Sequence, residues 1–180
     1  MDHFESIIAT LLEAENYWVR RSFKVIVTKE EKSQIIGKPS IPRPEIDLLA
    51  FRFSENEVIA LEVKSFFDSP GVRFADLQEE HEVPKGLFKV FTSERYRSVV
   101  LSALLRDLIA GGMANSDTKV TLGLAAGKVY KKQSDQIREF MNQKNWFFWS
   151  PEDIKKRVAA LAERRYENDP AIITAKILTR

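Results

Sequence analysis

Two neighbouring segments that are apolar on both faces of a strand constrain the fold of this chain most. Residues 45–53 (EIDLLAFRF) and 58–67 (VIALEVKSFF) are joined by the short polar sequence SENE. Such a pair predicts two strands joined as a β-hairpin. Because both faces of these strands are apolar over much of their length, we expect helices to cover the sheet from above and below.

The rest of the chain supplies such helices and further strands. Apolar residues at helical spacing predict a first helix at 3–15, and alternating apolar and basic residues predict a strand at 17–27. The segments 28–44 and 68–91 contain glycine and proline and are expected to be loops. Further helices are expected at 93–110, 134–143, 151–167 and after Pro170, and further strands at 119–127 and 146–150. This order predicts an α/β fold with a central mixed β-sheet flanked by helices.

Composition limits the number of domains and the available chemistry. With 180 residues, 44% of them hydrophobic, we expect a single domain over residues 1–180, its core ending at about 150 and a helical extension at about 151–180. The chain has no cysteine, which excludes disulfides, thiolate zinc sites and cysteine nucleophiles, and it has only two histidines. A catalytic site would therefore depend on carboxylates.

The chain shows no membrane or export signal. Its first residues, MDHFESII, lack the basic and apolar regions of a signal peptide. The most apolar stretch, VVLSALLRDLIAGGM, is interrupted by Arg106 and Asp107 and falls short of the roughly 20 apolar residues of a membrane span. We therefore expect a cytoplasmic protein without a membrane partner.

Three charged residues interrupt the apolar strands: Asp47 in the first, and Glu62 and Lys64 in the second. Burying such groups without partners costs several kcal/mol each, so we expect them to pair, bind a metal or catalyse. Side chains alternate across a strand, which places Glu62 and Lys64 on one face. A two-residue loop at the SENE turn brings Asp47 opposite Glu62, and a four-residue loop brings it opposite Lys64. A three-residue loop would move Asp47 to the other face.

This combination of side chains indicates metal-dependent hydrolysis. Two carboxylates a few ångströms apart repel each other unless a cation lies between them. Their hard oxygens suit Mg²⁺ or Mn²⁺, which keep several waters and accept phosphate oxygens as further ligands. An ion bound in this way polarises a phosphate and lowers the pKa of a bound water. Lys64 can orient that water or stabilise charge that develops on the phosphate.

The sequences PEID at 44–47 and LEVKS at 61–65 resemble the signature of the PD-(D/E)xK nuclease superfamily. The resemblance covers about the first 65 residues and implies a restriction endonuclease-like three-layer fold, with Asp47, Glu62 and Lys64 as catalytic residues. One departure is that two residues separate Pro44 from Asp47. The order of elements is similar to that of archaeal Holliday-junction resolvases and Mrr-like restriction enzymes.

Many members of the superfamily also carry a glutamate in the first helix, and Glu5 occupies a similar place. The resemblance implies that Glu5 joins Asp47 and Glu62 in holding Mg²⁺ or Mn²⁺ and that the substrate is DNA. Glu13 and Glu15 are alternatives to Glu5 as the acid that faces the site. The resemblance is also compatible with a homodimer, because similar folds dimerise to cut two strands.

Basic residues suggest where a nucleic-acid backbone would lie. Residues 20–43 hold seven basic and two acidic residues, against a net charge of only +2 for the whole chain. The nucleic-acid-binding candidates are Arg20, Arg21, Lys24, Lys38, Arg43, Arg95 and Arg97. The competing interpretations are a solvated hairpin for the first five and salt-bridged surface residues for the last two. The aromatic residues 146–149 could stack on bases, or form part of the core, and His81 is expected to be exposed.

Three functions follow from this pattern. The first is a Mg²⁺-dependent endonuclease-like phosphodiesterase that acts on DNA. The second is a catalytically silent module with a nuclease fold that binds nucleic acid or a protein, in which the three charged residues persist as an ion-paired cluster. The third is a nuclease directed at RNA.

Overall fold

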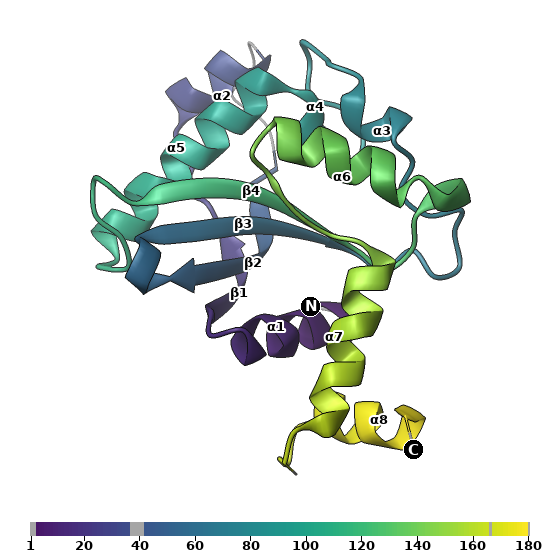
Figure 1. The fold of residues 1–180 in the computed structure, drawn as a ribbon. Coiled ribbons are helices and arrows are strands. Elements are labelled where there is room, and N and C mark those ends of the chain that lie inside the picture. Colours follow the sequence, from purple (N-terminus) through teal and green to yellow (C-terminus); the bar gives the residue numbers. More distant parts are fainter. Residues whose placement is uncertain (1–2, 37–41, 166, 180) are drawn as a thin grey trace.

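A five-stranded β-sheet forms the centre of the molecule (Figure 1). The computed structural model describes residues 3–36, 42–165 and 167–179. The strands lie side by side in the order of the chain, with β1 antiparallel to β2, β2 antiparallel to β3, and β3, β4 and β5 parallel. They are β1 (Trp18–Lys24), β2 (Glu45–Arg52), β3 (Glu57–Lys64), β4 (Lys119–Ala126) and β5 (Phe147–Trp149).

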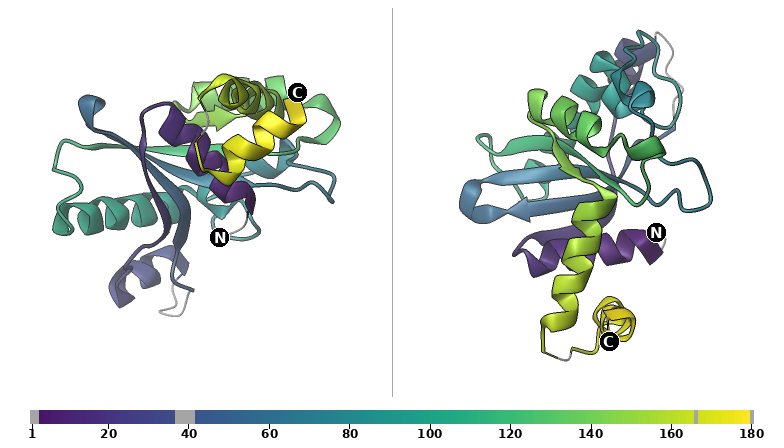
Figure 2. Two further views of the ribbon diagram at one scale, coloured as in Figure 1. Left: turned by 90° about the horizontal axis from the view of Figure 1, so that it is seen from below. Right: turned by 45° about the vertical axis from the view of Figure 1, so that its right-hand side comes forward.

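Helices cover both faces of this sheet, which gives three layers (Figures 1 and 2). One layer holds α1 (His3–Ala14), α7 (Pro151–Glu163) and α8 (Pro170–Thr179). The other holds α2 (Lys29–Ile36), α3 (Ala75–Gln78), α4 (Lys89–Thr92), α5 (Glu94–Ala110) and α6 (Ser134–Gln143). The short 3₁₀ turns η1 (Phe53–Glu55) and η2 (Tyr130–Lys132) complete the structure. The expected α/β architecture with a mixed sheet is thus confirmed.

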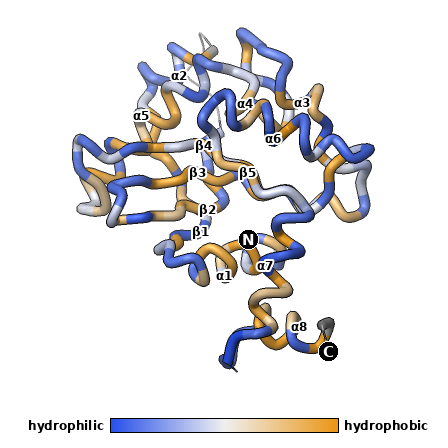
Figure 3. Tube along the Cα trace, viewed as in Figure 1, coloured by the Kyte–Doolittle hydropathy of each residue, from blue (hydrophilic) through white to orange (hydrophobic). Residues whose placement is uncertain are grey.

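Alternation along β2 shows why both faces need cover. Leu48 and Ala50 are buried against the layer of α1 and α7, whereas Leu49 and Phe51 are buried against the layer of α5. Figure 3 shows hydrophobic residues along the central strands and on α1, and a hydrophilic connection after α7. The aromatic segment 146–149 alternates in the same way between the two cores, which confirms that it is part of the core.

The register of the central hairpin determines where its charged residues lie. Leu48 lies opposite Leu61, and Arg52 lies opposite Glu57 at the end of the hairpin. Extending this register by one residue beyond Leu48 places Asp47 opposite Glu62. This is the pairing that was predicted for a two-residue loop, with Asp47 opposite Glu62 and not opposite Lys64.

The structure corrects the prediction of a loop at 28–44, because α2 occupies residues 29–36. The helix begins with a reciprocal cap: Glu31 N–H donates to Thr28 Oγ1 over 3.2 Å, and Thr28 N–H donates to Glu31 Oε2 over 2.8 Å. A Thr followed three residues later by Glu is the sequence signature of such a cap. The prediction of a loop rested on Gly37 and the three prolines that follow it, because glycine and proline are typical of loops.

Two further boundaries differ from expectation. The first strand ends at Lys24, earlier than predicted, after Ser22 adopts a positive φ of 52° that interrupts regular strand geometry. The segment 68–91, predicted to be a loop, contains the single-turn helices α3 and α4. Neither helix is long enough to produce a readable period in the sequence.

The later helices begin as the sequence predicts. Ser93 caps α5 by accepting a hydrogen bond from Tyr96 N–H, and Ser150 and Asp153 form a capping box at the start of α7. Within the described residues, no helix is both long and apolar enough to cross a membrane.

Candidate active site

Asp47, Glu62 and Lys64 converge where β2 begins and β3 ends. Lys64 Nζ lies 3.7 Å from Asp47 Oδ2 and forms a direct ion pair with Glu62 Oε1. Asp47 Oδ2 also accepts a hydrogen bond of 2.8 Å from the backbone N–H of Val63. The Asp47 carboxylate therefore bonds to the end of the neighbouring strand, and this bond fixes its orientation toward Lys64.

The three groups change one another's ionisation. Burial raises the pKa of Glu62, the Asp47 charge raises it further, and the Lys64 charge opposes both. For Lys64, burial alone would lower the pKa, but Glu62 and Asp47 together outweigh burial and raise it. Lys64 is thus a cation throughout the neutral pH range.

The cluster is open to solvent on one side. The side chains of Lys64 and Glu62 are each 18% exposed and that of Asp47 is 21% exposed. Glu62 and Lys64 line a cavity of about 230 Å³. Its other walls come from the segment before β2, from the start of α4 and from α5; they include Arg43, Ile46, Lys89, Val90, Tyr96 and Val100. The Lys64–Glu62 ion pair therefore forms part of the wall of a pocket that a ligand can enter.

Glu5 lies near this cluster in the first turn of α1 and is half-buried. The Phe4 and Phe67 rings meet edge to face with centroids 5.3 Å apart, which holds that turn against the segment after β3. The Glu5 charge is among those that raise the pKa of Lys64. Of the alternatives, Glu13 is exposed and Glu15 is ion-paired with Arg157 at 2.6 Å. The structure thus brings Glu5, among these three acids, within electrostatic reach of the cluster.

The donor set is suited to a hard divalent ion held by two carboxylates. In the part of the chain that the structure describes, no three His, Asp or Glu side chains come together as a metal-binding group, so Glu5 does not form a three-acid cage with Asp47 and Glu62. Mg²⁺ does not need one, because it keeps several waters and is commonly bound by one or two carboxylates plus substrate phosphates. The Lys64 ammonium, paired with both Asp47 and Glu62, shows that this pair accommodates positive charge.

The basic candidates separate into several groups. Arg43 lines the cavity. Arg97 is structural, because its Nη1 donates to the carbonyls of Phe91 (2.9 Å) and Val90 (3.3 Å) and its guanidinium lies over the Trp146 ring. Arg97 is half-buried, and its contact with nucleic acid stays a prediction.

The remaining candidates that the structure describes lie away from the cavity walls. Arg95 lines a separate open groove of about 700 Å³ together with three glutamates. Arg20, Arg21 and Lys24 are exposed on the edge strand β1, and Lys38 lies outside the described residues. His81, expected to be exposed, is half-buried, and its backbone N–H donates to the Thr92 carbonyl.

Lys89 and Tyr96 also line the cavity but were not among the predicted site residues. Tyr96 is 6% exposed, and burial together with the nearby Glu62 charge raises its pKa to about 12. The Lys89 charge in turn lowers the pKa of Glu62. Tyr96 had a sequence signal, because it lies one turn after the Ser93 cap at an inward helical position. Lys89 had none, since it follows an irregular segment.

Comparisons with known proteins identified no relative: no protein-family model matches the chain, and the searches of curated proteins and of solved structures found no match. The function is therefore inferred from the side chains and their surroundings.

Proposed function

We propose that this chain is a metal-dependent nuclease with a restriction endonuclease-like fold, which hydrolyses phosphodiester bonds in DNA. The observation that carries this proposal is the convergence of Asp47, Glu62 and Lys64 from two neighbouring strands, with Glu62 and Lys64 on the wall of an open cavity. A mixed sheet whose first three strands are antiparallel and whose last three are parallel, with a helix before β1, supports the proposal. The PD-(D/E)xK resemblance rests on the same residues.

In this proposal each side chain has one role. Asp47 and Glu62 hold Mg²⁺ or Mn²⁺, and Glu5 assists directly or through a water molecule. When bound, such an ion supplies Lewis-acid polarisation of the phosphate and a water of lowered pKa. Lys64, which is paired with both carboxylates, orients that water or stabilises negative charge that develops on the phosphate.

The test is cleavage of DNA by the purified protein. With Mg²⁺ or Mn²⁺, the wild-type protein is expected to nick plasmid DNA, as measured on agarose gels. Lys64→Ala and Asp47→Ala are expected to lose at least about 100-fold in rate while circular dichroism shows them folded, because each removes a group that acts on developing charge. Full cleavage by either folded variant would remove the assignment.

Glu57→Gln is the matched control. Glu57 is also a half-buried acid of β3 with a lysine partner, Lys119 at 3.1 Å, but it lies at the other end of the strand. Its loss is expected to leave the cleavage rate unchanged. A comparable loss in this variant would show that the rate reports on the stability of the hairpin and not on the cluster.

One observation favours a second function, that of a silent binding module. The Lys64 ammonium is paired with both carboxylates, so the protein itself supplies a cation that offsets part of their negative charge. Tight binding of DNA or RNA without cleavage under Mn²⁺ would support this alternative. Preference for RNA over DNA in a competition assay would identify an RNA-directed nuclease.

A further inference from the structure

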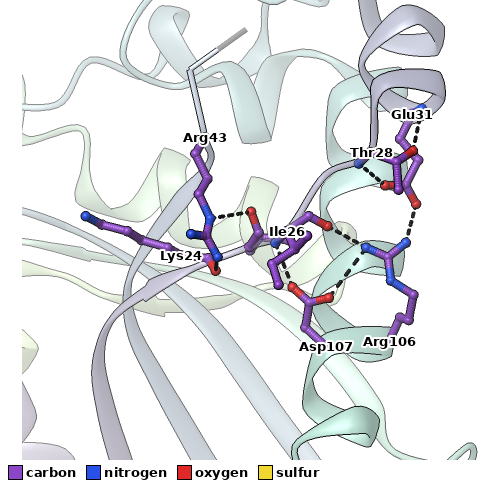
Figure 4. Close-up of polar contacts among 8 residues, drawn as sticks. Lys24, Ile26, Thr28, Glu31, Arg43, Arg106 and Asp107 are labelled. Carbon is purple, nitrogen blue, oxygen red and sulfur yellow. Dashed lines mark hydrogen bonds and ion pairs between the residues drawn. The ribbon is translucent and has the colours of Figure 1, made fainter. Parts of the chain in front are cut away.

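Two cations besides Lys64 line the site cavity. Lys89, the first residue of α4, and Arg43, just before β2, contribute to its walls from segments far apart in the sequence. Arg43 Nε donates to the Val25 carbonyl over 3.2 Å and its Nη2 donates to the Lys24 carbonyl over 2.9 Å (Figure 4). These bonds hold the guanidinium in place at the cavity, so its charge is fixed there.

Neither cation forms a direct ion pair with a described carboxylate, although the Lys89 charge acts on Glu62 and Glu45 also lines the cavity. Among the ion pairs that join described residues, none includes Lys89 or Arg43. Lys89 Nζ instead lies 5.1 Å from the centroid of the Tyr96 ring, close enough for a cation–π contact. Lys64 differs from both, because it is paired with Glu62 and Asp47. Two cations without a direct ion pair in one cavity are suited to an anionic ligand.

The cavity is accessible and large enough for such a ligand. At Gly86, which has a φ of +72°, an added Cβ would meet nothing within 4 Å, and the neighbouring Leu87 is 67% exposed. The volume of about 230 Å³ corresponds to roughly seven waters at about 30 Å³ each. A chain of nucleotides could therefore run along this opening and place a phosphate inside.

We propose that Lys89 and Arg43 form a subsite for a second, non-reacting phosphate of the substrate, beside the phosphate that faces Lys64. This inference rests on the proposed nuclease function and narrows its substrate to a polynucleotide with at least one phosphate flanking the bond that is cut. The subsite contributes binding and alignment, and the Asp47, Glu62 and Lys64 cluster contributes the chemistry.

Binding without cleavage gives the first test. Asp47→Asn removes one charge of the cluster yet keeps an oxygen for the Val63 N–H, so in this background the affinity for a fluorescein-labelled DNA duplex can be measured by anisotropy with Mg²⁺ present. Adding Lys89→Gln is expected to weaken binding about tenfold. The slope of log affinity against log salt concentration is expected to fall in magnitude by about 0.9, the contribution of one phosphate contact.

Three further variants make this test specific. Lys89→Arg keeps the charge and is expected to restore both affinity and slope, which separates loss of charge from misfolding. Arg43→Gln is expected to behave like Lys89→Gln. Lys156→Gln removes an exposed lysine of α7, in the layer on the other face of the sheet, and is expected to change neither quantity.

Hydrolysis gives the second test. In otherwise wild-type protein, Lys89→Gln is expected to lose about tenfold more in kcat/KM on DNA than on bis(p-nitrophenyl) phosphate, which has a single phosphate. An equal loss on both substrates would overturn the subsite, because Lys89 would then act at the reacting phosphate.

The outcomes of the two proposals are distinguishable. The subsite is overturned if Lys89→Gln matches Lys156→Gln in affinity and salt slope, or if the Asp47→Asn protein shows no salt-dependent binding of DNA. Neither result depends on cleavage. Absence of cleavage by the wild-type protein would instead overturn the nuclease, and the binding result for Lys89 would stand.

Discussion

The Lys64 ammonium lies 3.7 Å from Asp47 Oδ2 and directly contacts Glu62 Oε1, so it separates two carboxylates that would otherwise repel each other. Lys64→Met keeps much of the side-chain volume and removes the charge. We expect the free energy of unfolding to fall by about 2–3 kcal/mol, because two mostly buried carboxylates lose their counter-charge. Urea unfolding at neutral pH measures this change.

The same variant tests whether a divalent ion can replace the ammonium. Mn²⁺ is expected to raise the Tm of Lys64→Met more than that of the wild-type protein, because a ligand that binds only the folded state stabilises it in proportion to its affinity. The control is Lys119→Met, which removes a 68% exposed partner of Glu57 and should change stability by less than about 1 kcal/mol. Absence of a Tm shift in both wild-type protein and Lys64→Met would contradict a metal site at Asp47 and Glu62.

Tyr96 makes a separate prediction at alkaline pH. Its pKa is raised from 10.0 to about 12 by burial and by the Glu62 charge. Between these values the folded state holds a proton that the unfolded state releases, so the contribution of Tyr96 to stability is complete below pH 10 and is lost as the pH rises toward 12. Between pH 9 and 11 the wild-type protein should therefore lose about 1.4 kcal/mol more stability than Tyr96→Phe, as measured by urea unfolding. Parallel losses would show that Tyr96 is ionised as readily in the folded as in the unfolded chain.

At the scale of elements, α2 is attached to α5 by a compact polar network (Figure 4). Arg106 of α5 is ion-paired with Glu31 of α2 and also donates to the Ile26 carbonyl, while Asp107 accepts from Ile26 N–H over 2.6 Å. The Arg106 side chain is 45% exposed, so its ion pair is partly in solvent and contributes little to stability. The network therefore positions α2 more than it adds to global stability.

Arg106→Ala is expected to loosen α2 locally. Hydrogen exchange measured by mass spectrometry should show faster exchange of the α2 amides and unchanged exchange in α7, because only α2 loses an anchor. As a control, Arg52→Ala removes another partly exposed ion pair, that of Arg52 with Glu55 at 3.1 Å. Hydrogen exchange of the α2 amides should be unchanged in this variant. Unaltered exchange of α2 in Arg106→Ala would show that Ile35, buried in the core, is a sufficient anchor.

The elements differ in how far the sequence predicts them. The apolar faces of β2 and β3 predict the hairpin. An odd sum of paired residue numbers places Asp47, Glu62 and Lys64 on one face, but it does not decide whether Asp47 lies opposite Glu62 or Lys64. The Thr28 and Glu31 cap shows that α2 was also predictable from a local signal. Lys89 was not, because its position beside Glu62 arises only when the irregular segment 68–91 folds back over the end of β3. The position of such a segment depends on tertiary contacts, which the periodicity of apolar residues in the sequence does not reveal.

At the scale of the whole molecule, the sheet depends on two separate cores. On one side α5 and α6 cover it, and on the other α1, α7 and α8 do so. The C-terminal segment 151–180, expected to be an extension beyond the core, supplies a large part of the second cover. Ile154 and Leu161 of α7 are buried there. Arg157 is ion-paired with Glu15, the residue after α1, and lies 4.3 Å from the centroid of the Trp149 ring.

Loss of α7 is therefore expected to disrupt the sheet that carries the site. A chain of residues 1–150 would expose the apolar face formed by Leu48, Leu61 and Trp149, and should show no cooperative thermal transition by circular dichroism. Leu161→Ala tests the same contact in the full chain and should cost about 2–4 kcal/mol, since the side chain is 2% exposed. Lys155→Ala, exposed on the same helix, should stay within about 0.5 kcal/mol of wild type. A cooperative unfolding transition of residues 1–150 would contradict this prediction. It would show that β2 and β3 keep their register, and hold Asp47, Glu62 and Lys64 in place, without α7 and α8.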